Sequence, residues 1–269
     1  MISKKVVVIG AGAAGLMAGA TAALYGASVT IIEKNKRVGR KIMITGKGRC
    51  NLANNCDVQT FINNVPVNGR FLYSAINAFT PEDTIEFFES KGLKTKTERG
   101  NRVFPASDKS VDVVDTMHDY AVESGCKIVC DTANALILED GAVIGVKCEE
   151  NTYYADSVII CCGGKSYPLT GSTGDGYTLA KQAGHTIVPL KPSLVPFTSG
   201  DKQCKDMQGL ALKNVALRIV DKNSKKTVYS DFGEMLFTHF GMSGPMILSA
   251  SILQTPAPHR PALSCVKNG

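Results

Sequence analysis

The sequence predicts an α/β fold with a parallel sheet near its N-terminus, and three features carry this prediction. An apolar, β-branched run at 6–9 stops at a glycine-rich turn, Gly10-Ala11-Gly12-Ala13-Ala14-Gly15. An alanine-rich stretch typical of a helix follows at 16–25. A second β-branched run at 29–32 then ends on Glu33. Strand, glycine turn, helix, strand and acid, in this order, form the βαβ unit that binds a dinucleotide.

The three glycines of the turn have separate expected roles. Gly10 permits a tight turn after the first strand, and Gly12 lets the backbone approach a pyrophosphate. Gly15 allows the helix to pack close to the strand. The N–H groups and the positive dipole end at the start of the helix would face the phosphates. Glu33 would accept hydrogen bonds from ribose hydroxyls.

Length and composition are typical of a globular protein with one large domain or two ordinary ones. The chain has 269 residues, of which 44% are apolar and 20% charged. Residues 6–32 carry no charge and could pass for a membrane span, but their five glycines and two short β-branched runs favour buried parallel strands. The apolar run also lacks a signal-peptide cleavage site. No membrane partner is expected.

The nine cysteines predict reduced thiols in a cytoplasm. Their number is odd and their spacing irregular, and no CxxC motif occurs. No cluster of Cys and His has the spacing of a metal site. A cytoplasmic protein without a bound metal is therefore predicted.

The net charge is +6, and much of the excess lies in a stretch without acids. Its cations are Lys34, Lys36, Arg37, Arg40, Lys41, Lys47 and Arg49. A nucleic-acid face is one interpretation. The stretch holds no aromatic residue for base stacking, however, and it directly follows the dinucleotide unit. Cofactor phosphates are therefore the favoured partner, with solvated side chains for about half of the cations, and nucleic acid is not expected.

Further elements are expected along the chain in alternation with glycine-rich loops. Residues 34–56 would form a long loop whose glycines expose backbone N–H groups. Thr80, Pro81 and Asp83 predict a capped helix start, and Ser107 would cap the helix that ends before Gly125. The remaining expected ranges are a helix at 68–79, a hairpin at 94–98 and 102–104, a strand at 127–131, a hairpin at 135–139 and 143–149 extended by 152–155, and a buried strand at 157–162.

The later part of the chain changes character near 190. A helix stops at Gly184, and three prolines between 189 and 196 suggest a domain crossing. Beyond it we expect strands at 215–220 and 227–230, a pocket wall of aromatics and glycines at 232–245 and a helix at 246–253. From 255 the sequence has no periodicity, and disorder is predicted.

Four motifs together resemble the BaiN-like, aminoacetone-oxidase-like family of FAD flavoproteins. The first is the glycine turn. The others are Gly39-Arg40-Lys41 with Thr45-Gly46-Lys47-Gly48-Arg49-Cys50-Asn51, then Gly163-Gly164-Lys165-Ser166-Tyr167-Pro168 with Gly171-Ser172-Thr173-Gly174-Asp175-Gly176, and the stretch from Gly233 to Gly241. The resemblance covers roughly residues 1–253. The second and third motifs are specific to this family, whereas the glycine turn alone is not.

The resemblance implies a Rossmann-type, two-dinucleotide-binding FAD domain at 1–188 with a β-hairpin module. Residues 189–254 would be part of an inserted, mainly β, substrate domain, and 255–269 an irregular tail. The family carries Ala-Thr where this chain has Cys161-Cys162, and packing is favoured over a redox pair because strand neighbours point to opposite faces. A late glycine-acid segment of the family has no counterpart after Leu253. We therefore expect a truncated FAD domain without its return segment.

The βαβ unit and the resemblance together predict a set of residues that bind FAD. These are Gly10, Gly12, Ala13, Ala14, Gly15, Glu33, Lys34, Arg40, Lys41, Thr45, Gly46, Gly48, Arg49, Cys50, Asn51, Ala133, Asn134, Cys162, Gly163 and Gly164. No catalytic residue is assigned. Tyr167 and His239 are candidates, although core packing is the favoured role for each.

The predicted function is that of an FAD-dependent oxidoreductase acting on a small organic substrate. The resemblance implies amine oxidation or reduction of a steroid-like enone, with NAD(P)H as a candidate electron donor. Two alternatives stay open: a non-catalytic remnant that binds flavin or nucleotide, and an NAD(P)-only dehydrogenase. The sequence does not set the oligomeric state.

Overall fold

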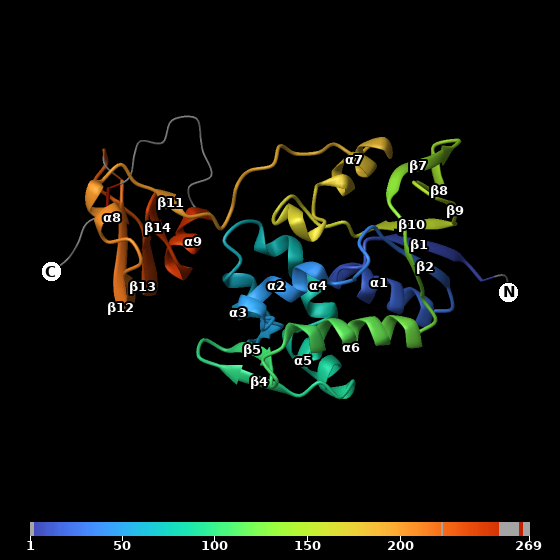
Figure 1. Ribbon diagram of the computed structural model, residues 1–269, viewed down its shortest axis with the longest axis horizontal. Helices are drawn as coiled ribbons and strands as arrows, with labels where there is room; N and C mark the ends of the chain where they lie inside the picture. Colours follow the sequence, from blue (N-terminus) through green and yellow to red (C-terminus); the bar gives the residue numbers. More distant parts are fainter. Residues whose placement is uncertain (1–2, 222, 253–263, 266–269) are drawn as a thin grey trace. The chain divides into compact units, whose positions relative to one another are not determined.

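The computed structural model describes residues 3–221, 223–252 and 264–265 (Figure 1). The chain divides into two compact units, Met1–Ile187 and Val188–Gly269. The sequence predicts a domain boundary at 188/189, one residue later than this division. The predicted irregular tail from 255 lies outside the described residues, apart from a short strand at Ser264–Cys265.

A four-stranded parallel sheet forms the centre of the first unit. Its strands are β1 (Lys5–Ile9), β2 (Ser28–Glu33), β6 (Lys127–Cys130) and β10 (Ser157–Ile160). They lie in the order β10-β1-β2-β6, and every pairing is parallel. The carboxyl ends of all four strands therefore meet at one edge of the sheet, which is where open α/β sheets bind ligands.

Each face of this sheet is covered by a different layer (Figure 1). Val8 and Ile31 are fully buried on one face, in a core shared with two helices. Val7 and Ile32 point to the other face and pack with an antiparallel sheet. The helices are α1 (Ala13–Leu24) and α6 (Ser110–Glu123), and the antiparallel strands are β7 (Ala133–Glu139), β8 (Ala142–Cys148) and β9 (Thr152–Tyr154). The uniformly apolar strands of the βαβ unit thus reflect burial on both faces.

The segment between β2 and α6 packs on the helical side and contains several short elements. They are α2 (Arg40–Ile44), the 3-10 turn η1 (Thr45–Gly48), β3 (Ala53–Asn54), α3 (Val58–Asn63), η2 (Gly69–Leu72), α4 (Tyr73–Ala78), α5 (Pro81–Ser90), β4 (Thr95–Glu98) and β5 (Arg102–Pro105). The expected loop at 34–56 therefore contains a short helix and a 3-10 turn. The strands form a small sheet in the order β3-β5-β4.

Two predicted helix caps have different outcomes. The Thr80–Asp83 capping box is confirmed, because each side chain accepts the other residue's backbone N–H. The prediction that Ser107 caps α6 is wrong. The helix begins at Ser110, and the Ser107 hydroxyl donates instead to the Asp112 carboxylate. The same hydroxyl accepts the backbone N–H of Lys109, the N-cap residue, at 3.3 Å, so Ser107 lies at the helix start without capping an N–H group of the first turn.

The second unit is built on an antiparallel sheet in the order β11-β14-β13-β12-β15. Its elements are β11 (Phe197–Thr198), α8 (Lys202–Asp206), β12 (Ala211–Val220), β13 (Thr227–Thr238), β14 (Gly241–Ser243), α9 (Pro245–Ser251) and β15 (Ser264–Cys265). The expected strand at 227–230 extends to Thr238, so part of the aromatic stretch belongs to β13. Met235, Phe237 and Met246 lie in the unit's core.

Among the described residues, no helix combines the length and the apolar character needed to cross a membrane. The cysteines that the structure describes with side chains are all free thiols. Within the same residues, no group of three or more His, Cys, Asp or Glu side chains could hold a metal ion. The cytoplasmic location stays a prediction.

Candidate cofactor site

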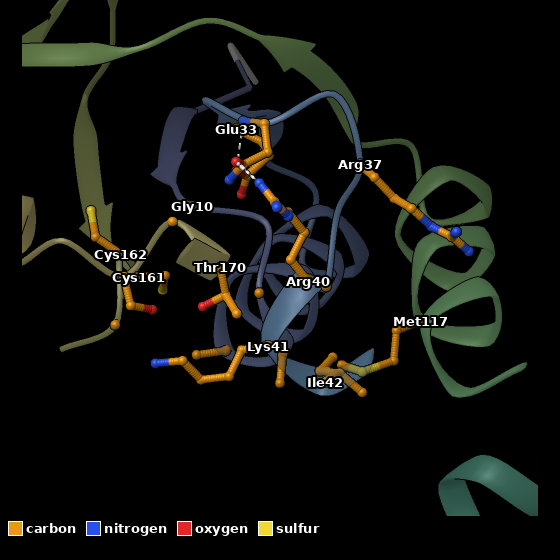
Figure 2. Close-up of a pocket in the computed structure, with 18 of the residues that line it drawn as sticks. Gly10, Glu33, Arg37, Arg40, Lys41, Ile42, Met117, Cys161, Cys162 and Thr170 are labelled. Atoms are coloured by element: carbon orange, nitrogen blue, oxygen red, sulfur yellow. Dashed lines mark hydrogen bonds between the residues drawn. The ribbon is translucent and has the colours of Figure 1, made fainter. Parts of the chain in front are cut away.

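A cavity of about 890 Å³ opens at the carboxyl ends of β1, β2 and β10 (Figure 2). The segment after β10 continues through the 3-10 turn η3 (Pro168–Thr170) into α7 (Asp175–Gln182) and supplies part of the wall. The cavity volume is in the range of natural small-molecule sites. Of the predicted cofactor-binding residues, those that line it are Gly10, Gly12, Ala13, Ala14, Glu33, Lys34, Arg40, Lys41, Thr45, Cys50, Asn51, Ala133, Cys162 and Gly163.

The glycine turn shows which of its residues serve the fold and which serve a ligand. Gly10 has φ +101°, and an added Cβ would lie 2.6 Å from the carbonyl oxygen of Cys161. A Cβ on Gly15 would lie 1.8 Å from the carbonyl oxygen of Gly10. Both glycines are therefore required by close backbone packing. A Cβ on Gly12 would meet no atom within 4 Å, although Gly12 lines the cavity. The space beside Gly12 is thus available to a ligand.

The start of α1 is prepared for an anion. Gly12 is its N-cap residue and provides no side-chain hydrogen bond, and the first turn contains no acidic residue. The first N–H groups of a helix have no partner within the helix, and the dipole places partial positive charge there. Ala13 and Ala14 line the cavity, so the start of the helix lies at its wall. A phosphate group can accept hydrogen bonds from these N–H groups, and its negative charge is stabilised by the helix dipole.

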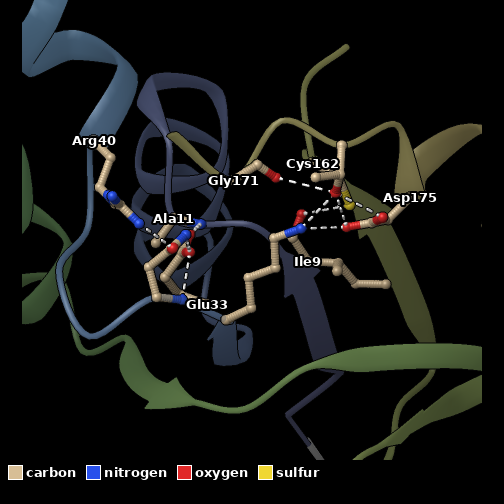
Figure 3. Close-up of polar contacts among 10 residues, drawn as sticks. Ile9, Ala11, Glu33, Arg40, Cys162, Gly171 and Asp175 are labelled. Atoms are coloured by element: carbon tan, nitrogen blue, oxygen red, sulfur yellow. Dashed lines mark hydrogen bonds and ion pairs between the residues drawn. The ribbon is translucent and has the colours of Figure 1, made fainter. Parts of the chain in front are cut away.

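Glu33 occupies the end of β2, where its carboxylate organises the turn (Figure 3). One oxygen, Oε2, accepts the backbone N–H of Ala11 at 2.9 Å. The other, Oε1, accepts the backbone N–H of Asn35 at 2.9 Å and its side-chain Nδ2 at 2.6 Å. A carboxylate has about four acceptor positions. Three are used within the protein, which leaves roughly one for a ribose hydroxyl.

Two cations at the cavity lack a carboxylate partner among the described residues. Arg40 donates from Nη1 to the Asn35 side-chain oxygen at 2.6 Å. Lys41 donates from Nζ to the Ser166 hydroxyl at 3.3 Å. Both line the cavity (Figure 2). Their charges are therefore free to neutralise phosphates.

Lys34 ties the end of β2 to the start of α7. Its ammonium lies 2.6 Å from Oδ2 of Asp175 and 2.7 Å from the Thr173 hydroxyl. Burial alone would raise the pKa of Asp175, but the hydrogen bonds from Lys34 and Thr173 outweigh it and hold the pKa below its ordinary value. This ion pair fixes the wall that the segment after β10 contributes.

Cys161 and Cys162 point to opposite faces of the sheet. Cys161 packs with the helical core and Cys162 with the core under the antiparallel sheet. Both are free thiols, so the prediction against a disulfide is confirmed. Burial, followed by the nearby Asp175 charge, raises the pKa of Cys162 to about 11. Its thiol hydrogen-bonds to the Ile9 carbonyl at 3.6 Å. These are the properties of protonated packing side chains.

Some predicted residues lie away from the cavity wall: Gly15, Gly46, Gly48, Arg49, Asn134 and Gly164. Neither catalytic candidate lies in a core. Tyr167 is 68% exposed, and His239 is exposed in the second unit, where its ring contacts Phe240 edge-on. The expected packing role is therefore wrong for both side chains.

Sequence reasoning missed several residues of the wall. They include Met17, Asn35, Thr84, Met117, Asp131, Thr132, Thr170, Gly171, Ser172 and Asp175. Asp131 and Thr132 directly follow β6, so the rule that ligands bind at the carboxyl ends of parallel strands could have found them. The Asp131 carboxylate accepts the backbone N–H groups of Thr132, Glu150 and Asn151, which anchors the antiparallel sheet beside the cavity.

Residues 4–250 match the family model described as the HI0933-like protein Rossmann domain. The chain belongs to this family. Its members are FAD-dependent oxidoreductases, so the predicted family, the α/β Rossmann-type fold and FAD as the cofactor are confirmed. The free space at Gly12, the open helix start, the Glu33 acceptor and the cations Arg40 and Lys41 all fit this cofactor.

Two curated relatives align along most of the chain. A 3-dehydro-bile acid delta(4,6)-reductase of Clostridium scindens is 31% identical over 247 residues, which cover 91% of this chain and 59% of the relative. A ribosomal RNA dihydrouridine synthase of Escherichia coli is 30% identical over 251 residues, which cover 93% of this chain and 61% of the relative. The chain thus spans about three fifths of the length of these relatives.

A solved structure of similar fold is the 3-ketosteroid-delta4-(5alpha)-dehydrogenase of Rhodococcus jostii RHA1. The two structures superpose with a TM-score of 0.53 at 14% sequence identity, covering 82% of this chain and 62% of that chain. At this identity the likeness concerns the fold alone.

Proposed function

We propose that the chain carries the FAD site of a flavoprotein reductase that acts on a carbon–carbon double bond conjugated with a carbonyl group. The observation that carries the proposal is the cavity at the strand ends. It is lined by Gly12, which has open space beside it, and by Arg40 and Lys41, which lack a carboxylate partner among the described residues. When bound, FAD supplies the hydride chemistry, and the protein binds and orients it.

The chain's own residues have distinct roles in this proposal. The backbone from Gly10 to Gly15 and the start of α1 bind the pyrophosphate, and Arg40 and Lys41 neutralise its charge. Glu33 accepts a hydrogen bond from the ribose. The Lys34–Asp175 ion pair holds the opposite wall in place. Met17 and Met117 give part of the cavity an apolar lining that suits an aromatic ring.

The reaction type is supported by what the two relatives share. One is named as a reductase of a 3-dehydro-bile acid at positions 4 and 6, and the other as a synthase of dihydrouridine in ribosomal RNA. Both names describe addition of hydrogen to a double bond conjugated with a carbonyl. Reduction is therefore favoured over amine oxidation, and the FAD family over an NAD(P)-only dehydrogenase.

The substrate itself has two candidates. A small organic enone is the first, as the sequence predicts. Uridine in RNA is the second, because a relative of nearly equal identity is named for it and because the chain has a net charge of +6 with a run of cations at 34–49. That run attracts the phosphates of a nucleic acid as well as those of a cofactor.

One experiment tests the proposed reaction. The protein is loaded with FAD, reduced anaerobically with NADPH or dithionite, and mixed with a 3-oxo-Δ4,6-steroid or with a uridine-containing RNA. We expect one substrate to restore the absorbance of oxidised flavin and to gain two hydrogens by mass spectrometry. If neither substrate changes, while oxygen reoxidises the bound flavin normally, the proposed reaction is wrong.

A further inference from the structure

Arg49 lies beside the cavity but does not line it, although its neighbours Cys50 and Asn51 do. Its Nε donates to Oδ1 of Asp108 at 2.7 Å, and its Nη2 donates to Oε1 of Glu98. These contacts bind the guanidinium to two acids that are also absent from the cavity lining. We call the set Arg49, Glu98 and Asp108 the Arg49 cluster.

The Arg49 cluster joins the loop from Thr45 to Asn51 to the β4–β5 hairpin and the residues that follow it, which lie about fifty residues later in the sequence. Glu98 ends β4, and Asp108 follows β5. The guanidinium also lies 4.1 Å from the centre of the Phe104 ring, on β5. A planar guanidinium with two carboxylate partners and an aromatic face has its orientation fixed by three groups. The β4–β5 hairpin thus acts as a support for the loop.

The loop from Thr45 to Asn51 needs such a support because its backbone is strained. Lys47 and Cys50 both have φ +60°, a left-handed conformation that residues other than glycine rarely adopt. Such residues are strained and persist only where their surroundings hold them. Gly46 is also tightly packed, since an added Cβ would lie 3.1 Å from the Phe104 ring.

We propose that Arg49 is a positioning residue for the cofactor: its ion pairs with Glu98 and Asp108 hold the strained loop in the shape that presents Thr45, Cys50 and Asn51 to the cavity. This inference rests on the proposed FAD site. It replaces the expectation that Arg49 binds the cofactor directly, and it assigns a role in cofactor binding to two acids that are distant in sequence and outside the cavity wall.

If Arg49 positions the loop, removing the Asp108 charge should weaken FAD binding; if Arg49 binds a phosphate directly, removing that charge should not. If Arg49 positions the loop, Asp108→Asn removes a support and weakens FAD binding in the same way as Arg49→Met. If Arg49 instead swings into the cavity to bind a phosphate, Asp108→Asn removes one of the two carboxylates that compete for the guanidinium and leaves FAD binding unchanged or tighter. Lys109→Met is the matched control, because Lys109 is the exposed neighbour of Asp108 and makes no ion pair within the described residues.

The test measures FAD dissociation constants of the full chain by fluorescence titration, together with the visible circular dichroism of the bound flavin. We expect Arg49→Met and Asp108→Asn each to weaken FAD binding about tenfold. The double variant should be no weaker than the worse single variant, because both changes break the same support. The flavin dichroism should change in these variants at saturating FAD, while Lys109→Met matches the wild type.

Several results would overturn the inference. Wild-type affinity in Asp108→Asn combined with weak binding in Arg49→Met would make Arg49 a direct ligand. Additive losses in the double variant would show that the two residues act separately. If Arg49→Met fails to fold, as judged by its thermal melting, Asp108→Asn decides by comparison with Lys96→Met, because Lys96 is the other cation that binds Asp108; weaker FAD binding in Asp108→Asn than in Lys96→Met supports the inference, and equal losses overturn it. A wild-type chain that binds no FAD would instead refute the proposed function itself, which separates the two failures.

Discussion

Gly12→Val separates the ligand-binding role of the glycine turn from its folding role. Gly12 has φ −81° and ψ −172°, an extended conformation that valine adopts readily, and an added Cβ meets no atom within 4 Å. The loss of glycine at an N-cap costs about 1 kcal/mol or less, partly offset by the lower entropy of the unfolded chain. The free energy of unfolding should therefore change by no more than about 1 kcal/mol.

The effect of Gly12→Val on FAD binding should be much larger. The valine side chain would fill the space in which the pyrophosphate approaches the backbone. Each charge-assisted hydrogen bond lost there is worth about 1.5–3 kcal/mol. Two such losses make at least about 3 kcal/mol, which is more than a hundredfold in the dissociation constant.

Gly15→Ala is the matched control for this experiment. Its Cβ would lie 1.8 Å from the Gly10 carbonyl oxygen, so it should destabilise the fold by about 1–3 kcal/mol or more. Urea unfolding measures stability, and quenching of flavin fluorescence measures binding. Wild-type FAD affinity in a folded Gly12→Val protein would refute the reasoning.

Three further predictions concern the same cavity. Glu33→Ala should weaken FAD binding at least about tenfold and lower stability, since the buried N–H of Ala11 loses its acceptor, whereas Glu33→Gln should retain most of the stability in urea unfolding. Replacing Cys161 by Ala and Cys162 by Thr together should change stability by less than about 1 kcal/mol and leave FAD binding intact; lost turnover with flavin still bound would point to a dithiol relay. Because burial raises the pKa of Cys162 from 9.0 to about 11, the unfolded chain loses this proton first as pH rises, and the free energy of unfolding should fall between pH 9 and 11. A Cys162→Thr protein with the same pH dependence would contradict this.

The features that the sequence predicts correctly are those whose interacting residues lie close together in the chain. The βαβ unit was recognisable because strand, glycine turn and helix follow one another directly, and the structure confirms the close packing at Gly10 and Gly15. The Thr80–Asp83 capping box was found for the same reason, since its partners are three residues apart. Motifs shared with the family then specified the cofactor.

The sequence does not show contacts between residues that are remote from one another in the chain. Its neighbours in the chain predict that Arg49 binds the cofactor, and nothing in the sequence indicates its carboxylate partners Glu98 and Asp108, which lie 49 and 59 residues later. Asp175 lines the cavity and pairs with Lys34, which lies 141 residues earlier in the chain. Ion pairs between residues so far apart produce no periodic pattern in the sequence, so only the folded structure shows them. Likewise, the sequence does not indicate whether the Ser107 hydroxyl caps the helix backbone or binds the Asp112 carboxylate.

The central claim is that the cavity at the strand ends binds FAD, and the most direct test is an equilibrium titration of the purified chain with FAD, NAD and NADP in parallel. Fluorescence or calorimetry gives the three dissociation constants under one set of conditions. The account predicts that FAD binds at least about tenfold more tightly than either nicotinamide cofactor, and that Gly12→Val removes this binding without unfolding the protein. Binding of NAD or NADP with no measurable binding of FAD would contradict it.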